Sequence, residues 1–226
     1  TIMAPNIPEM FEAHFGVAMA GAVLNTLNTR LDTDTIAYIL EHADTRLLIT
    51  DAAFGEAMKT ALAQTKNKKI KIIDIIDQQA SESVSGLRLG EQDYETFLNG
   101  ADPDYKWQMP ADEWQAMCLN YTSGTSGRPK GVVYHHRGAY LMAMGTIPVW
   151  NMPMHPTYLY VVPLFHCNGW GHAWMMAIVA GTTVCCRKII AEDIYPLITE
   201  HKVTHFGGAP IVLSLSLIHI SEPTRP

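Results

Sequence analysis

The residues best suited to chemistry lie in the stretch YTSGTSGRPKGVVYHH, which spans positions 121–136. Glycine permits positive φ angles and a close backbone approach, so Gly124 and Gly127 could turn successive N–H groups toward an anion. Pro129 stiffens the exit of the stretch. Hydroxyl and ammonium groups add further donors. The stretch therefore predicts a phosphate-binding loop with side-chain donors from Thr122, Ser123, Thr125, Ser126 and Lys130.

Other glycine-rich loops fit this stretch less well. Lys130 follows Pro129, and no Ser or Thr follows the lysine, so the stretch is not a Walker A loop. It has no dinucleotide G-x-G-x-x-G, and neither Ser123 nor Ser126 lies in a G-x-S-x-G nucleophile elbow. A flexible Ser/Gly linker is disfavoured because the apolar segments MCLNY and GVVY frame the stretch.

The elements around the loop are expected to place it between a strand and a helix. AMCLNYTS (116–123) predicts a strand, and HHRGAYLMAMGTIPVW (135–150) predicts a helix. The opening TIMAPN is typical of a strand end that enters a turn, and the polar segment 77–93 predicts a surface loop. Further strands are expected at 45–50, 68–76, 157–163, 182–187 and 203–208, and further helices at 8–22, 32–43, 51–65, 171–181 and 191–202. The segment 94–114 is expected to begin with a short helix and to continue as an irregular connector.

Apolar strands that alternate with helices predict an α/β fold with layered, largely parallel sheets flanked by helices. Ligands are expected beyond the carboxyl ends of the strands. The chain has 226 residues and a net charge of −6, with no basic stripe, which argues against nucleic-acid binding. No apolar run approaches the roughly 20 residues of a membrane span, and the first ten residues do not resemble a signal peptide.

The four cysteines are expected to be free thiols in a reducing cytosol, which predicts a cytoplasmic location. No C-x-x-C occurs, and Cys185 and Cys186 would point to opposite faces of a strand. His166, Cys167 and His172 lack zinc-site spacing, and adjacent histidines at 135 and 136 diverge on a helix, so no metal site is predicted in the protein.

The loop closely resembles the signature TSGTTGxPKG of the AMP-forming adenylating enzymes, with Ser126 in place of the second threonine. Three further segments resemble the acyl-CoA synthetase branch of that family, particularly its short- and medium-chain fatty acid–CoA ligases. They are PNIPEMFEAHFGVAMAGAVLNTLNTRLD, PLFHCNGWGHAW and VTHFGGAP.

The resemblance implies ATP-dependent activation of a carboxylic acid to an acyl adenylate and then to acyl-CoA, with Mg²⁺ bridging the phosphates. His166 and Lys130 are the catalytic candidates: His166 would lie beside the acyl carboxylate. The residues that follow His166 would wall the acyl pocket, with Trp170 closing it at modest depth. The implied sites are Thr122, Ser123, Gly124, Thr125, Ser126, Gly127 and Lys130 for the phosphates, and His166, Cys167, Asn168, Gly169 and Trp170 for the acid.

Two alternatives to a CoA ligase stay open. The acyl group could pass to a carrier-protein thiol, or the chain could be a non-catalytic nucleotide-binding module. The resemblance also implies that residues 1–214 are part of an N-terminal domain truncated at both ends. The segment 215–226, LSLIHISEPTRP, resembles a translated sequencing adapter. We therefore expect the isolated chain to be poorly soluble and catalytically incompetent; the oligomeric state is left open.

Overall fold

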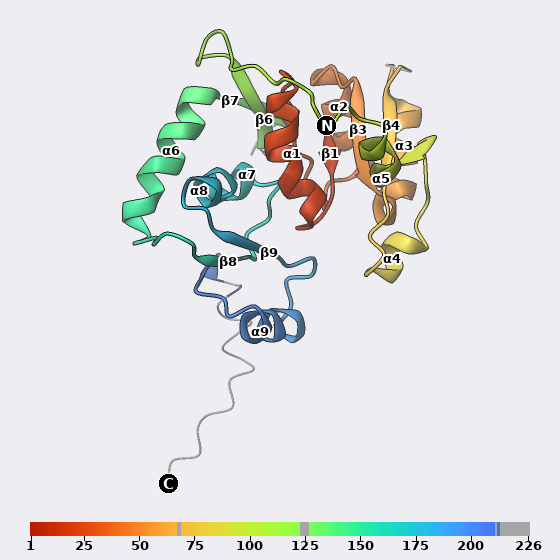
Figure 1. Cartoon of the computed structure of the whole chain (residues 1–226). Helices are drawn as coiled ribbons and strands as arrows, with labels where there is room; N and C mark the ends of the chain where they lie inside the picture. Colours follow the sequence, from red (N-terminus) through yellow and green to blue (C-terminus); the bar gives the residue numbers. More distant parts are fainter. Residues whose placement is uncertain (67–68, 123–126, 211, 213–226) are drawn as a thin grey trace.

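The computed structural model describes residues 1–66, 69–122, 127–210 and 212 (Figure 1). In this part of the chain, three small sheets are flanked by helices, and all strand pairs but one are parallel. The expected α/β class with largely parallel sheets is confirmed. No helix within the described ranges is long and apolar enough to cross a membrane.

The first sheet has the strand order β1-β3-β4-β5, and every pair in it is parallel. Consecutive residues of β3 point to opposite faces: Leu48 packs with helices α2 and α3, and Ile49 packs with α1. Asp32 caps α2 by accepting a hydrogen bond from the Thr35 amide. The bounds are β1 Ile2–Met3, β3 Leu47–Asp51, β4 Lys71–Ile75, β5 Gln92–Asp93, α2 Thr33–His42 and α3 Gly55–Gln64.

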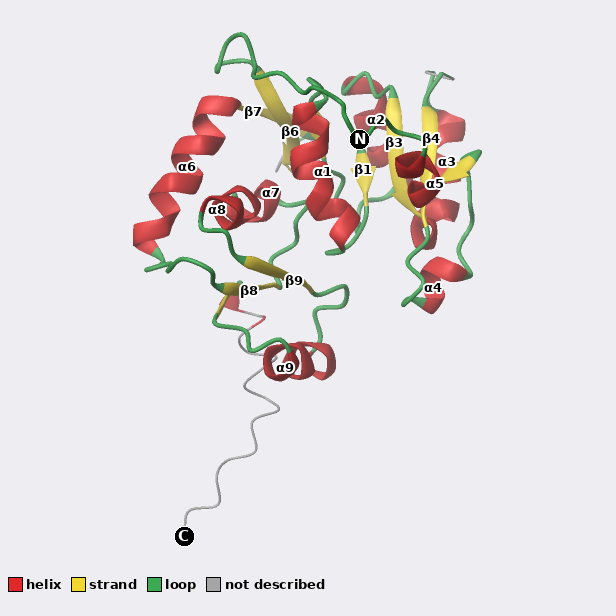
Figure 2. Ribbon diagram, viewed as in Figure 1, coloured by secondary structure: helices red, strands yellow, loops and turns green. Residues whose placement is uncertain are grey.

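Helix α1 (Pro8–Met19) lies between this sheet and the rest of the molecule (Figure 2). Pro8 occupies the first turn, where its missing N–H costs no helical hydrogen bond. Met10 and Ala13 are buried in a core cluster that includes Leu24 and Tyr160 from the other two sheets. The apolar face of α1 therefore joins the three sheets into one core.

The second sheet carries the glycine-rich stretch, and here one sequence prediction is wrong. Residues 130–135, expected to lead directly into a helix, form strand β7 antiparallel to β6. The loop is therefore the tip of a hairpin. The β-branched Val132 and Val133 and the pairing with β6 favour the extended conformation before α6 begins. The bounds are β2 Leu24–Asn25, β6 Ala116–Thr122, β7 Lys130–His135 and α6 His136–Val149, and β2 pairs with β6 in parallel.

The third sheet has the parallel order β10-β8-β9 and is covered on both faces. Leu159 packs with Ile194 of α9 on one face, and Tyr160 packs with Met175 of α8 on the other. Cys186 joins the α9 cluster, and all four cysteines are free thiols, as expected. The bounds are β8 Thr157–Tyr160, β9 Thr182–Cys185, β10 His205–Gly207, α8 His172–Ile178 and α9 Ala191–Glu200.

The segment 77–93, expected to be a loop without regular structure, contains a short helix and the edge strand β5, so this prediction is wrong in detail. Two further helical elements belong to the same side of the molecule. The bounds are η1 Ala52–Phe54, α4 Ser81–Val84 and α5 Tyr94–Asn99. Residues 100–115 connect α5 to β6 without a helix or strand, as predicted.

An arginine after β9 links the third sheet to the first. The Arg187 guanidinium lies 2.7 Å from Asp51 Oδ2, 3.0 Å from Asp77 Oδ2 and 3.2 Å from Glu82 Oε1. The Asp51 side chain is fully buried at the end of β3. The buried carboxylate is thus compensated by a cation that comes from the other side of the core.

Candidate functional site

The two ends of the glycine-rich loop face each other across the β6–β7 hairpin. Thr122 and Lys130 are cross-strand partners, and both are exposed. Gly127 has a φ of 127°, a value that favours glycine. The predicted donors Ser123, Gly124, Thr125 and Ser126 lie outside the described residues. The mouth of the loop therefore carries a hydroxyl and an ammonium group on neighbouring strands, an arrangement that fits a polyphosphate ligand.

The exit of the loop lies beside helix α2. The Arg128 guanidinium is 5.4 Å from the ring centre of Tyr38, and the Tyr121 hydroxyl is 2.7 Å from His42 Nδ1. The nearby cavity has acidic as well as basic side chains, including Glu41 and Asp34. Because of this mixed charge, the α2 side of the loop is a poor site for an anion.

The segment predicted to bind the acid forms a left-handed turn. From Cys167 through Gly171, five consecutive residues have positive φ angles, between 46° and 71°. Among these residues, Asn168 is fully buried and Trp170 is half-buried, and the preceding His166 is exposed. Left-handed geometry costs roughly 1–2 kcal/mol for each residue with a side chain. The turn, labelled α7 (Cys167–Trp170), is therefore a strained element that needs support from its surroundings.

Buried hydrogen bonds connect this turn to the strand that leads into the loop. Asn120 Nδ2 donates to Asn168 Oδ1 at 2.6 Å, and the Thr26 hydroxyl lies 3.1 Å from Asn120 Oδ1. The same hydroxyl lies 2.8 Å from the Phe165 carbonyl oxygen. Asn120 precedes Thr122 by only two residues on β6. The fold thus brings the two segments singled out in the sequence into direct contact.

A second asparagine holds the chain just before the turn. Asn6 Nδ2 donates to the carbonyl oxygens of Tyr160 and Val162 at 3.0 Å each, and Asn6 Oδ1 accepts from the Leu164 amide at 2.8 Å. These bonds satisfy backbone groups that β8 no longer pairs after Tyr160. The path from β8 to His166 is therefore fixed from the α1 side.

Next to the turn is an aromatic cluster that the sequence did not reveal. The Trp150 ring is 6.3 Å from Trp170 and 4.7 Å from His172, and His172 Nδ1 is 2.7 Å from the Tyr158 hydroxyl. A Cβ atom on Gly207 would clash with Trp150, which places the end of β10 against the same ring. The only sequence signal for Trp150 was its place at the end of a predicted helix, which is also an ordinary place for a packed tryptophan.

Burial sets the charge state of this cluster. Desolvation lowers the pKa of His172 to about 4, so its imidazole is neutral at pH 7. On the other side of the turn, burial first and then the neighbouring Cys167 thiol raise the pKa of Tyr134 to about 12. Cys167 Sγ also lies 3.9 Å from His166 Nε2. The neutral imidazole of His172 thus adds no charge beside the turn.

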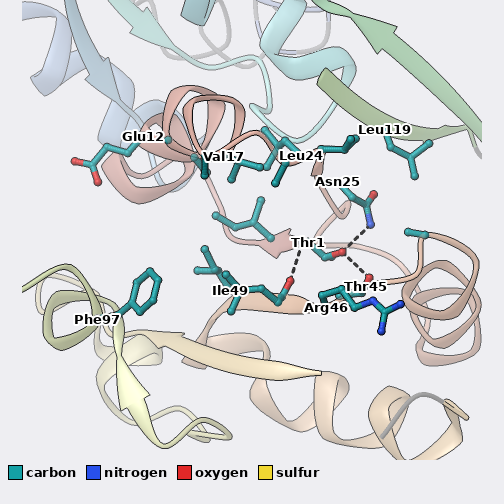
Figure 3. A pocket seen from close by; sticks show the side chains of 18 of the residues that line it. Thr1, Glu12, Val17, Leu24, Asn25, Thr45, Arg46, Ile49, Phe97 and Leu119 are labelled. Atoms are coloured by element: carbon teal, nitrogen blue, oxygen red, sulfur yellow. Dashed lines mark hydrogen bonds between the residues drawn. The ribbon is translucent and has the colours of Figure 1, made fainter. Parts of the chain in front are cut away.

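A mostly apolar cavity of about 600 Å³ lies elsewhere, between α1, α5 and the strands β1 and β3 (Figure 3). Thr1, Asn25 and Phe97 are among its lining residues, and Asn25 Nδ2 donates to the Thr1 hydroxyl at 3.0 Å. None of the predicted site residues that the structure describes lines it. Within the described ranges, no group of three His, Cys, Asp or Glu side chains could hold a metal ion.

Solved structures share this arrangement of sheets. The o-succinylbenzoate CoA synthetase of Bacillus subtilis in complex with its acyl-adenylate intermediate aligns with 99% of this chain and 52% of its own, with a TM-score of 0.76 and 23% identity. The N-terminal domain of FACL13 from Mycobacterium tuberculosis aligns with 95% of this chain and 50% of its own, with a TM-score of 0.78 and 22% identity. The fold is that of the N-terminal domain of acyl-CoA synthetases.

Sequence similarity identifies the family. Residues 1–224 match the AMP-binding enzyme family, and the chain belongs to it. It is 46% identical over 221 residues to a peroxisomal acetate/butyrate–CoA ligase of Arabidopsis thaliana. The alignment covers 94% of this chain and 39% of that protein. It is 43% identical to a 2-methylpropanoate–CoA ligase of Humulus lupulus, over 100% of this chain and 41% of that protein. The chain thus spans about two fifths of the length of these relatives.

Proposed function

We propose that this chain is the loop-bearing part of the N-terminal domain of an acid–CoA ligase, which activates a carboxylic acid with ATP and transfers the acyl group to CoA. The observation that carries the proposal is the contact between the two ligand-binding segments. Asn120, two residues before the phosphate loop, donates directly to Asn168 in the turn assigned to the acid. Adenylation requires this proximity, because the acid carboxylate must reach the α-phosphate of ATP.

Each part of the site has a role in the proposed reaction. Thr122 and Lys130, with the loop between them, bind the β- and γ-phosphates and stabilise the charge that develops on the leaving pyrophosphate. Mg²⁺ would enter with the nucleotide and would neutralise phosphate charge. His166 is exposed and next to the turn, where it orients the acid carboxylate. The hydroxyl and ammonium at the loop mouth fit this ligand set.

A short or medium acyl chain is the proposed substrate. Trp170 lies against Trp150, which also packs on the end of β10 at Gly207, and in the proposed complex this pair of rings would close the acyl pocket at modest depth. The names of the two relatives above refer to acetate, butyrate and 2-methylpropanoate, which supports a small acid. A reducing compartment is also proposed, and the cytoplasm fits the four free thiols, although the name of one relative places it in peroxisomes.

Transplantation tests the function without knowledge of the remaining protein. Residues 1–212 replace the matching segment of the Arabidopsis relative, and the chimera is assayed for acid-dependent exchange of pyrophosphate into ATP and for acyl-CoA formation. We expect activity on acids of two to eight carbons and its loss in the Lys130→Ala chimera. A folded chimera that binds ATP but catalyses no exchange with any acid contradicts the proposal and favours a nucleotide-binding module.

Two further points belong to the same proposal. We expect the isolated 226-residue chain to bind MgATP without forming acyl-CoA, because residues 1–214 represent only part of the domain. Resequencing the codons for residues 211–226 from genomic template tests the adapter origin of the tail. Adenylation by the natural longer protein without use of CoA would favour transfer to a carrier-protein thiol.

A further inference from the structure

The turn at Cys167–Trp170 cannot hold its conformation by local bonds alone. Its backbone is closed by two hydrogen bonds of 3.0 Å, from the Gly169 amide to the His166 oxygen and from the Gly171 amide to the Asn168 oxygen. Against these stand three residues with side chains in the left-handed region, a conformation that is unfavourable for each of them. External contacts must therefore hold the turn in place.

Asn120 makes the main polar contact of this kind. Its amide donates to Asn168 Oδ1 at 2.6 Å, and both side chains are buried, with exposed fractions of 7% for Asn120 and 0% for Asn168. A hydrogen bond in such a low-dielectric place is stronger than one in water. Within the described part of the chain, the Asn168 Nδ2 atom has no hydrogen-bond partner. The side chain of Asn168 is thus anchored at one point, and that anchor is Asn120.

Thr26 completes the link on the other side of His166. Its hydroxyl lies within bonding distance of two acceptors, Asn120 Oδ1 at 3.1 Å and the Phe165 carbonyl oxygen at 2.8 Å. Phe165, just before His166, thus contacts Thr26, and Asn168, two residues after His166, contacts Asn120. A displacement of the end of β6 would move or release both flanks of His166.

We propose that Asn120 is a positioning residue that couples nucleotide binding at the loop after β6 to acid binding at the turn that follows His166. The inference rests on the proposed function, because it assigns ATP to the loop and the acid to the turn. Asn120 touches neither ligand in this scheme and acts through Asn168. Thr26 supports it by fixing the orientation of the Asn120 amide.

The coupling follows from shared ordering. A nucleotide on the loop fixes Thr122 and hence the end of β6, and the Asn120–Asn168 bond then holds the strained turn in one conformation. An acid that binds afterwards meets a turn that is already ordered and loses less conformational entropy. By thermodynamic reciprocity, the acid strengthens nucleotide binding by the same factor. With the bond removed, this contribution to the coupling is lost.

Titration calorimetry measures this factor directly in the chimera that carries residues 1–212, which is the wild type of this series. The probes are butyrate and the magnesium complex of α,β-methylene-ATP, whose P–C bond prevents formation of the adenylate. In the wild type we expect butyrate to bind at least five-fold more tightly when the analogue is saturating, the lower end of typical couplings. Thr26→Val should reduce the factor to below two-fold, and Thr26→Ser, which restores the hydroxyl, should recover it.

Asn168→Gly removes the bond without straining the turn, because glycine adopts positive φ readily. This variant should fold and lose the coupling factor even where its affinity for butyrate changes, because the factor compares the same variant with and without the analogue. Asn120→Ala should behave in the same way if it folds. Thr146→Val, whose hydroxyl bonds Met142 O within α6, is the matched control and should keep the wild-type factor.

The outcomes separate the two proposals. If the folded wild type binds neither probe, the proposed function fails and the inference fails with it. If both probes bind and Asn168→Gly and Thr26→Val keep the wild-type factor, only the inference is overturned. The inference is supported if the factor is lost in those two variants and kept in Thr26→Ser and Thr146→Val. A general loss of stability would not depend on whether residue 26 carries a hydroxyl.

Discussion

Replacement of Arg187 by methionine isolates the ionic link between the first and third sheets. The guanidinium lies within 3.2 Å of three carboxylates, and one of them, on Asp51, has no exposure to solvent. Without Arg187, the Asp51 carboxylate retains its 2.9 Å hydrogen bond from the Ala53 amide but no counter-charge at contact distance among its described partners. Removing one partner of a buried ion pair typically costs about 3–5 kcal/mol.

Lys188 provides the matched control at the neighbouring position. Its ammonium lies 3.2 Å from Glu82 Oε1, but its side chain is 55% exposed. An exposed pair of this kind is worth about 0–1 kcal/mol. Lys188→Met should therefore leave the free energy of unfolding nearly unchanged, although it removes the same formal charge.

Urea unfolding at pH 7, followed by circular dichroism, measures both changes from the transition midpoint and slope. We expect Arg187→Met to lower the free energy of unfolding by about 3–5 kcal/mol. The double variant Asp51→Asn/Arg187→Met should regain part of the loss, because the uncompensated charge is removed. An Arg187→Met protein as stable as Lys188→Met would refute the reasoning that burial makes this link strong.

The same link has a pH signature with a defined sign. The pKa of Glu82 is lowered from 4.5 to about 2, first by the hydrogen bond from its own backbone N–H and then by Arg187 and Lys188. A carboxylate with a lowered folded-state pKa stabilises the protein above its unfolded value, and this contribution is lost as the pH falls from about 4.5 toward 2. The stability difference between wild type and Arg187→Met should therefore narrow over that range.

Three further predictions concern the site and its support. Lys130→Ala should weaken MgATP binding about 10- to 100-fold, since a hydrogen bond to a charged group contributes about 1.5–3 kcal/mol. The melting temperature should stay unchanged because Lys130 is exposed. An unchanged Kd in calorimetry would contradict the role of Lys130. Gly207→Ala should destabilise the protein by about 1–3 kcal/mol in thermal unfolding because its new Cβ meets Trp150, and Trp150→Leu should suppress the effect. Burial lowers the pKa values of His14 and His172 to about 4. As the pH falls from 6 to 4, the unfolded state therefore binds more protons, and the free energy of unfolding should fall by about 1.4 kcal/mol per pH unit for each histidine. His172→Phe should show a smaller slope than the wild type.

Local patterns predicted most elements of the fold because the apolar periodicity of helices and strands is written in consecutive residues. Residue type alone also favours an aspartate at a helix cap and a proline in a first helical turn, as at Asp32 and Pro8. The strand at 130–135 was missed because its pairing is with β6 across the loop, and the short extended segment GVVY had been assigned to the frame of the loop. Two-residue strands such as β2 exist only through their partners and leave almost no local signal.

The candidate site shows the same division. Thr122, Lys130 and His166 could be named from motif resemblance, and the structure places the segments that carry them in contact. Thr26 and Asn120, which join those segments, could not be found this way. An isolated threonine or asparagine in an apolar stretch has no distinctive spacing, and its role depends on a neighbour that lies far away along the chain.

The link between Thr26 and Asn120 also limits the order in which parts of the protein can fold during synthesis. The two residues are 94 positions apart, and strand β2, only two residues long, pairs with β6 at the same place. A ribosome that adds about 5–20 residues per second needs about 5–20 seconds to deliver the partner strand after β2 has been made. During that interval Leu24 has no sheet to join. The first sheet and helix α1 can form meanwhile, but the site can assemble only after the segment from β6 to the left-handed turn has left the ribosome.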